Sequence, residues 1–167
     1  MTAISVRQAR DTDVEAVAEI LREAAAWLDT RGDTMWRMDE LASRAIHAEV
    51  GAGMFWIAEQ GSEIAGVVRF QLEDALMWPD ARAGEAAYVH RLAVRRSGAG
   101  GAVSSALLDF AVRRTRELGR GRLRLDCEAG RPRLRAVYER YGFRYHSDRR
   151  VGPYLVARYE LPVAPRP

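Results

Sequence analysis

A glycine-rich turn between two regular patterns is the part of the sequence best suited to bind an anion. Residues 88–94 are mostly apolar and suit a strand, and residues 95–101 (RRSGAGG) are basic and glycine-rich. From Ala102 onward, apolar residues recur every three or four positions, as in a helix. The first amides of a helix lack intrahelical partners and lie at the positive end of its dipole. Small residues let oxygens reach these amides, so the sequence predicts a pyrophosphate-binding turn.

Two common phosphate-binding motifs do not fit this turn. A P-loop requires a lysine followed by a hydroxyl residue, but all 26 basic residues of the chain are arginine. A dinucleotide-binding turn has the pattern G-x-G-x-x-G, whereas Val103 stands where its third glycine would be. A nucleotide kinase is therefore disfavoured. A flexible connection without a ligand is the alternative interpretation of the turn.

The segments VHRLAVRRSGAGGAVSSALLDFA, RLRLDC and RLRAVYERYGF together resemble the Gcn5-related N-acetyltransferase (GNAT) family. In that family the acetyl-CoA loop follows an LAV-type strand, here Leu92 to Val94, and a later helix ends in Y-x-x-x-G-F, here Tyr138 to Phe143. The family loop pattern Q/R-x-x-G-x-G/A falls on Ala99 to Ser104, and it departs at Ala99, Ala102 and Ser104. These substitutes are small, so access to the backbone is kept.

The resemblance implies acetyl-CoA as co-substrate and a set of residues that bind it. That set is Leu92, Ala93, Val94, Ala99, Gly100, Gly101, Ala102, Val103, Ser104, Ser105, Arg131 and Tyr138. Arg131 occupies a position where the family often has an asparagine that bonds the pantetheine; an arginine there could reach a phosphate or face solvent. Tyr138 corresponds to the acid that protonates the departing thiolate, and the amide near Leu92 corresponds to the oxyanion donor.

Transfer of an acetyl group to an amine also requires a base, because an amine is protonated at neutral pH. His90 alternates in phase with Tyr88 and Leu92, matches a histidine used by arylalkylamine acetyltransferases, and histidine titrates near neutrality. Asp126 matches a glutamate position used by ribosomal-protein alanine acetyltransferases, and Glu85 is a third candidate. The absence of any single essential base is the remaining alternative. The neighbouring Cys127 is interpreted as a small core residue.

Two tryptophans are candidates for the acceptor pocket, together with His90. Trp36 lies in the irregular stretch 29–38, which in the family links two helices and helps form that pocket. Trp78 lies in the long connection 73–84 and precedes a proline, which favours extended backbone. Packing of Trp36 on the core is the alternative.

Length and composition limit the number of domains, the location and the metal content that we expect. With 167 residues, 48% of them hydrophobic, we expect one domain over residues 1–161 and a disordered tail over 162–167. Apolar runs are too short for a membrane span or a signal peptide, which favours a cytoplasmic location. One cysteine and three dispersed histidines offer no zinc-ligand spacing, so no metal is expected.

The remaining patterns predict an α/β fold. Strands are expected near residues 4–9, 54–59, 63–72, 88–94, 122–127, 143–148 and 154–161, and helices near 11–28, 39–50, 102–118 and 132–141. The expected fold is a single GNAT-like domain with a mixed, mostly antiparallel sheet of six or seven strands and helices on both faces.

We therefore expect an acetyl-CoA-dependent N-acetyltransferase that acts on the primary amine of a small molecule or peptide. An idle acyl-CoA-binding or sensing domain is the first alternative. Residues 113–150 carry 13 arginines against 5 acidic residues, so a basic nucleic-acid-binding module is the second. That stretch lacks interleaved aromatic residues and a recognition helix, so no nucleic-acid partner is expected. Binding to a membrane is not expected either. A homodimer is a further expectation.

Overall fold

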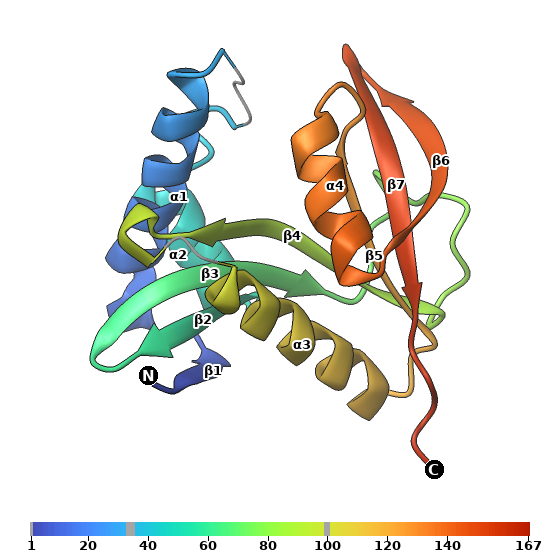
Figure 1. Ribbon diagram of the computed structural model, residues 1–167, viewed down its shortest axis with the longest axis horizontal. Coiled ribbons are helices and arrows are strands. Elements are labelled where there is room, and N and C mark those ends of the chain that lie inside the picture. Colours follow the sequence, from blue (N-terminus) through green and yellow to red (C-terminus); the bar gives the residue numbers. More distant parts are fainter. Residues whose placement is uncertain (1, 33–35, 99–100) are drawn as a thin grey trace. The chain divides into compact units, whose positions relative to one another are not determined.

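The computed structural model describes residues 2–32, 36–98 and 101–167 (Figure 1). Its strands are β1 (Ile4–Gln8), β2 (Phe55–Gln60), β3 (Glu63–Gln71), β4 (Ala86–Val94), β5 (Arg122–Glu128), β6 (Arg144–Val151) and β7 (Tyr154–Pro162). Its helices are α1 (Val14–Asp29), α2 (Ser43–Gly51), α3 (Ala102–Glu117) and α4 (Pro132–Tyr141), with short 3-10 turns at Asp11–Asp13 and Arg96–Gly98. The strand–turn–helix order predicted around residue 100 is confirmed on both sides of Ala99 and Gly100, which lie outside the described residues.

The strands form one seven-stranded sheet in the order β1-β2-β3-β4-β5-β7-β6. The pairs β1–β2, β2–β3, β5–β7 and β6–β7 are antiparallel, and β4–β5 is parallel. The predicted α/β class and the mixed, mostly antiparallel sheet are therefore confirmed, with seven strands. Within this fold, contacts divide the chain into two compact units, and β3, β4 and α3 each run through both.

The first unit comprises Met1–Arg69 and Arg91–Phe110. Helices α1 and α2 bury their apolar stripes against alternate residues of β2, among them Phe55 and Ile57. The residue between these two, Trp56, points to the opposite face and meets Phe110 of α3 with ring centroids 4.4 Å apart. Helices therefore cover both faces of this part of the sheet, as predicted.

Gly66 of β3 permits the close approach of α3. A Cβ atom at this position would lie 2.7 Å from Val103 Cγ1 and 3.1 Å from the carbonyl oxygen of Ala93. Contacts that short do not occur between carbon atoms in folded proteins, so any larger residue would displace the start of α3. The sequence at β3 thus fixes where the helix after the glycine-rich turn begins.

The entry to α1 is held by Asp13. The Asp13 carboxylate accepts the Arg10 backbone N–H at 2.7 Å and two guanidinium N–H groups of Arg7 at 2.8 and 3.2 Å. The hydrogen bond from Arg7 is the main cause that lowers the pKa of this buried carboxyl, and burial opposes it. A 3-10 turn at Asp11–Asp13 precedes the helix, so α1 begins at Val14 and not near residue 11 as expected.

We expect Asp13→Asn to lower the free energy of unfolding by about 1–3 kcal/mol at neutral pH, because it leaves Arg7 without its buried acceptor. Since the folded pKa of Asp13 is depressed, its stabilisation is present above its unfolded pKa, about 3.9, and is lost as the pH falls through the folded value. Urea unfolding at pH about 7 and about 3 checks this. The exposed Asp11→Asn serves as control, and an equal effect at both pH values would contradict the prediction.

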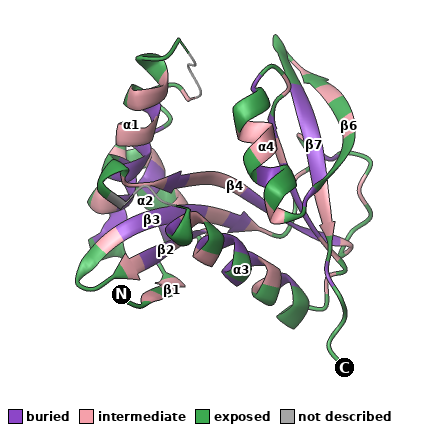
Figure 2. Cartoon of the chain, viewed as in Figure 1, coloured by how far each residue is buried: buried purple, intermediate pink, exposed green. Residues whose placement is uncertain are grey.

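The second unit comprises Phe70–His90 and Ala111–Pro167. Strand β7 pairs with β5 on one side and with β6 on the other. Figure 2 shows the middle of β7 buried and β6 without a buried residue, as suits the place of β6 at the edge of the sheet. Helix α4 starts with Pro132 at its first turn and ends at Gly142, whose φ of 126° favours glycine, and both features agree with the sequence prediction.

Two boundaries differ from expectation. Helix α2 begins at Ser43 and not near residue 39, and Asp39 lies in a preceding turn, where it pairs with Arg37 at 3.1 Å. In the predicted tail, residues 162–167, the start is held in place: Val163 is 4% exposed and its N–H donates to the Gly121 carbonyl at 2.9 Å. No helix among the described residues is long and apolar enough to cross a membrane.

Candidate active site

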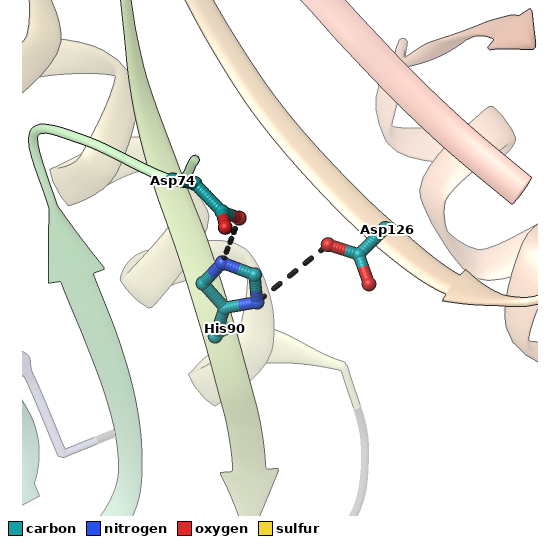
Figure 3. Close-up of side chains that lie close together, drawn as sticks. All are labelled: Asp74, His90 and Asp126. Atoms are coloured by element: carbon teal, nitrogen blue, oxygen red, sulfur yellow. Dashed lines mark hydrogen bonds and ion pairs between the residues drawn. The ribbon is translucent and has the colours of Figure 1, made fainter. Parts of the chain in front are cut away.

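Three ionisable side chains of the second unit meet at the residue that the sequence singled out as a base (Figure 3). His90 Nε2 lies 2.8 Å from Asp74 Oδ2, and His90 Nδ1 lies 3.7 Å from Asp126 Oδ1. The side chains of His90, Asp74 and Asp126 are 15%, 7% and 9% exposed. The structure therefore brings together two of the three candidate bases and adds a carboxylate that the sequence analysis had not identified.

The parallel pairing of β4 with β5 explains why His90 and Asp126 meet. The register aligns Ala86 with Arg122 and Tyr88 with Arg124, so two residues further along His90 faces Asp126. Because side chains alternate along a strand, these residues point to the same face of the sheet. The third candidate base, Glu85, is instead engaged by Arg124 and accepts the Arg82 N–H.

Asp74 comes from the connection 73–84, which follows β3. Its Oδ1 accepts the backbone N–H of Met77 at 3.1 Å, and its carbonyl oxygen accepts the N–H of Trp78 at 2.8 Å. Both bonds close a tight turn that begins at Asp74. The carboxylate is therefore oriented by the loop's own backbone while its other oxygen faces His90.

Trp78 anchors this loop in the core of the second unit. Its side chain is 2% exposed and is packed between the guanidinium groups of Arg124 and Arg158, whose Cζ atoms lie 4.5 and 4.6 Å from the ring centroid. Arg158 also binds Asp80 at 2.7 Å. Trp78 is thus buried beneath the loop, and of the proposed acceptor contacts in this unit only His90 retains exposed surface.

Cys127 and Tyr138 are the other titratable groups near Asp126. Burial raises the pKa of the Cys127 thiol to about 11, so it stays protonated at neutral pH and is not a nucleophile, as predicted. Tyr138 of α4 is 9% exposed, and burial, followed by the charges at Cys127 and Asp126, raises its pKa above the ordinary tyrosine value. Tyr138 therefore holds its proton at neutral pH and can act as a donor.

Comparisons with known proteins identify the family. The acetyltransferase (GNAT) family model matches residues 14–143. An uncharacterized N-acetyltransferase of Bacillus subtilis (strain 168), YesJ, is 31% identical over 150 residues, which cover 86% of this chain and 83% of YesJ. The chain belongs to the GNAT family of acetyltransferases.

Solved structures agree in fold. A GNAT acetyltransferase from Listeria monocytogenes 4b F2365 aligns with a TM-score of 0.79 at 23% identity, covering 95% of this chain and 94% of the other. The structure of yncA from Salmonella typhimurium, solved with its cofactor acetyl-CoA, aligns with a TM-score of 0.73 at 15% identity, covering 99% and 97%. The GNAT resemblance seen in the sequence is confirmed.

The GNAT residues of the first unit lie on β4 and at the start of α3. Arg91 has a φ of 50°, uncommon for a residue other than glycine, and it lies within β4 directly before Leu92. Ala93 is buried in the core, while Leu92 and Val94 are half-buried. The backbone of β4 is therefore irregular next to the candidate oxyanion donor.

The described part of the glycine-rich turn has the open geometry that an anion site needs. Gly101 has a φ of 85° and no atom within 4 Å of where its Cβ would lie. Ala102 and Ser105 are exposed, Ser104 is half-buried and Val103 is buried. The Ser105 N–H already bonds the Gly101 carbonyl at 2.9 Å. The amides of Ala102 to Ser104 are those that precede the first complete helical turn.

Arg131 and Trp36 complete the predicted set. Arg131 is 9% exposed and its Nε donates to Glu128 at 2.9 Å, so it does not face solvent, which was one of the two alternatives. Trp36 is half-buried and packs against the core of the first unit. Trp36 therefore packs on the core, which was the alternative interpretation, and part of its side chain stays exposed.

Proposed function

We propose that this GNAT protein transfers the acetyl group of acetyl-CoA to the primary amine of a small molecule or peptide by direct attack on the thioester. The proposal rests on the pairing of His90 with Asp126. This pair supplies a base, and the chain belongs to an acetyltransferase family. The relative solved with acetyl-CoA supports the choice of co-substrate.

In the proposed reaction the amine nitrogen attacks the thioester carbonyl carbon. A C–N bond forms, the carbonyl oxygen becomes an oxyanion, and the C–S bond then breaks. The proton lost by the amine goes to His90 or Asp126, and Tyr138 gives its proton to the departing thiolate. The amide of Leu92, next to the positive φ of Arg91, is the proposed oxyanion donor.

Asp126 lies near both the candidate bases and the candidate acid. It faces His90, and its charge is one of the causes, after burial and the charge at Cys127, that raise the pKa of Tyr138. A base and an acid that act on one thioester must both reach it, so the nearness of both groups to Asp126 supports this division of labour.

We propose that the cofactor's pantetheine arm pairs with the backbone of Leu92 to Val94, like an added strand, and that its pyrophosphate is held by amides at the start of α3. Arg131, which is buried beside Glu128, is the proposed side-chain contact to the same ligand. Cofactor affinity should then depend on backbone access at the start of α3 more than on any single cation.

We expect Ala102→Val to raise the dissociation constant of acetyl-CoA about tenfold, roughly 1.4 kcal/mol, because a branched side chain would shield the first amides of α3. Ala106→Val, one turn later in α3, carries the same helix-propensity cost and is the matched control. Isothermal titration measures both variants. Equal affinities for the two variants and the wild type, with the fold intact, would remove this turn from the binding site.

Turnover distinguishes the proposed enzyme from an idle acyl-CoA-binding domain. Purified protein is mixed with acetyl-CoA and a panel of aliphatic, aromatic, polyamine and peptide amines, and the release of free CoA thiol is followed. We expect amine-dependent release with at least one amine. Tight binding of acetyl-CoA without release with any of these classes would favour the idle domain.

A further inference from the structure

We infer that Asp74 is a positioning residue that holds His90 in the tautomer protonated at Nε2, which makes Nδ1 the atom that accepts the amine's proton. The inference rests on the proposed function and decides between its two candidate bases. It assigns proton acceptance to His90 and charge stabilisation to Asp126. The sequence analysis had not identified Asp74 as a site residue.

The orientation of Asp74 is set independently of His90. Oδ1 is taken by the Met77 N–H at 3.1 Å, and the Asp74 carbonyl is taken by the Trp78 N–H at 2.8 Å. Only Oδ2 is directed at His90, at 2.8 Å (Figure 3). An ionised carboxylate accepts hydrogen bonds and donates none, so with Asp74 ionised this contact requires a hydrogen on Nε2.

The other ring nitrogen has a different environment. Asp126 Oδ1 lies 3.7 Å from Nδ1, which is longer than a hydrogen bond. In the neutral ring, therefore, the lone pair of Nδ1 is not committed to Asp126. When Nδ1 takes a proton, the carboxylate at this distance stabilises the imidazolium that forms. A ring oriented on one side and stabilised on the other is the arrangement by which a histidine acts as a base.

A metal ion is the competing use of the same three residues. One donor atom from each of Asp74, His90 and Asp126 lies within 4.8 Å of the others, so the set could hold a cation. The two carboxylates, however, approach different nitrogens of the ring (Figure 3). A single ion binds one nitrogen of an imidazole and needs its other ligands on that side. The observed arrangement suits proton transfer better than coordination.

Other titratable groups adjoin the cluster from three elements. Tyr88 of β4 is affected by the charge of Asp74, although burial is the main cause that raises its pKa. Cys127 of β5 and Tyr138 of α4 are both affected by Asp126, and burial raises the pKa of each. All three are therefore neutral near pH 7.

Asp74→Asn tests the inference, because the backbone of the loop dictates how the new amide is oriented. The Met77 N–H needs an acceptor, so it selects the amide oxygen and leaves the NH₂ group facing His90 Nε2. A donor at that position moves the ring hydrogen to Nδ1 and removes the base. Asp74→Ala imposes no tautomer, and Glu73→Gln removes a neighbouring charge that does not contact His90 and is the matched control.

Nitrogen-15 NMR of the histidine rings reports the tautomer directly, at a pH where the rings are neutral, with His90 assigned by His90→Gln. We expect hydrogen on Nε2 in the wild type and in Glu73→Gln, and on Nδ1 in Asp74→Asn. We also expect kcat/KM to fall on the order of 10²–10³ in Asp74→Asn and by less in Asp74→Ala. A merely structural role would instead make Ala the more damaging change.

Several outcomes would overturn the inference. They are hydrogen on Nδ1 in the wild type, an unchanged tautomer in Asp74→Asn, or a ring signal that shifts on addition of zinc ion and returns with a chelator. The NMR result needs no substrate. Failure of the wild type to acetylate any amine would therefore count against the proposed function, while the tautomer measurement decides the role of Asp74.

Discussion

Replacing His90 by glutamine should lower kcat/KM on the order of 10²–10⁴ near neutral pH, because the amine then has to lose its proton without a positioned base. Glutamine keeps a polar group opposite Asp74 but cannot accept and release a proton. Activity of the variant should rise steadily with pH, since a larger fraction of the amine is then already neutral. Steady-state kinetics over a range of pH values measures both effects.

The control for His90→Gln is His47→Gln, which changes an exposed histidine on α2 in the first unit. That variant should keep the wild-type rate and pH profile. A combined change at His90 and Asp126 should cost little more than His90→Gln alone, because the two residues act as one unit. Wild-type kinetics in His90→Gln would exclude this histidine as the base.

Removing the hydroxyl of Tyr138 has the second largest expected effect. Tyr138→Phe keeps the buried ring, which packs edge-on against Phe143 with centroids 6.1 Å apart. Stability and acetyl-CoA affinity should therefore change little, while kcat should fall on the order of 10² where chemistry limits turnover. Because the pKa of Tyr138 is raised, it stays protonated below pH about 10, and the loss should be the same across that range.

Tyr154→Phe is the matched control, since Tyr154 is 56% exposed on β7. Rapid-quench measurement of a single turnover shows whether chemistry is limiting. If Tyr138→Phe turned over at the wild-type rate under such conditions, Tyr138 would be a core residue only.

Local patterns predicted most of the fold because they record burial on one face of an element. Short stretches of sequence were enough to predict the apolar stripe on α1, the turn before Ala102, and the boundaries of α4 at Pro132 and Gly142. The start of α2 was misplaced by four residues, because the chain around Asp39 forms turns before the helix begins at Ser43. Hydrophobic periodicity does not separate a turn from the first residues of a helix.

The site was predicted in part. His90 and Asp126 were identified one at a time, but their contact depends on the register of a parallel strand pair, which involves residues 36 positions apart. Asp74 lies in an irregular connection, where hydrophobic periodicity gives no information. The one local signal was its position three residues before Met77, which suits a turn closed by an aspartate side chain.

The charge pattern was the least informative feature. Arg124 belongs to the basic stretch 113–150, yet it is 5% exposed and pairs with Glu85 at 3.3 Å and Glu160 at 3.2 Å. Both partners lie outside that stretch, so a count of charges over residues 113–150 misses them. The count therefore overstated the free positive charge at Arg124.

Transfer of a carbon-13-labelled acetyl group tests the central claim most directly. The protein is incubated with labelled acetyl-CoA and the amine that released most CoA, and the product is analysed by mass spectrometry and NMR. We predict that the label appears in an amide bond on the acceptor nitrogen, in amounts equal to the CoA released. Label recovered as free acetate, or left in acetyl-CoA for every amine, would contradict acetyl transfer to an amine.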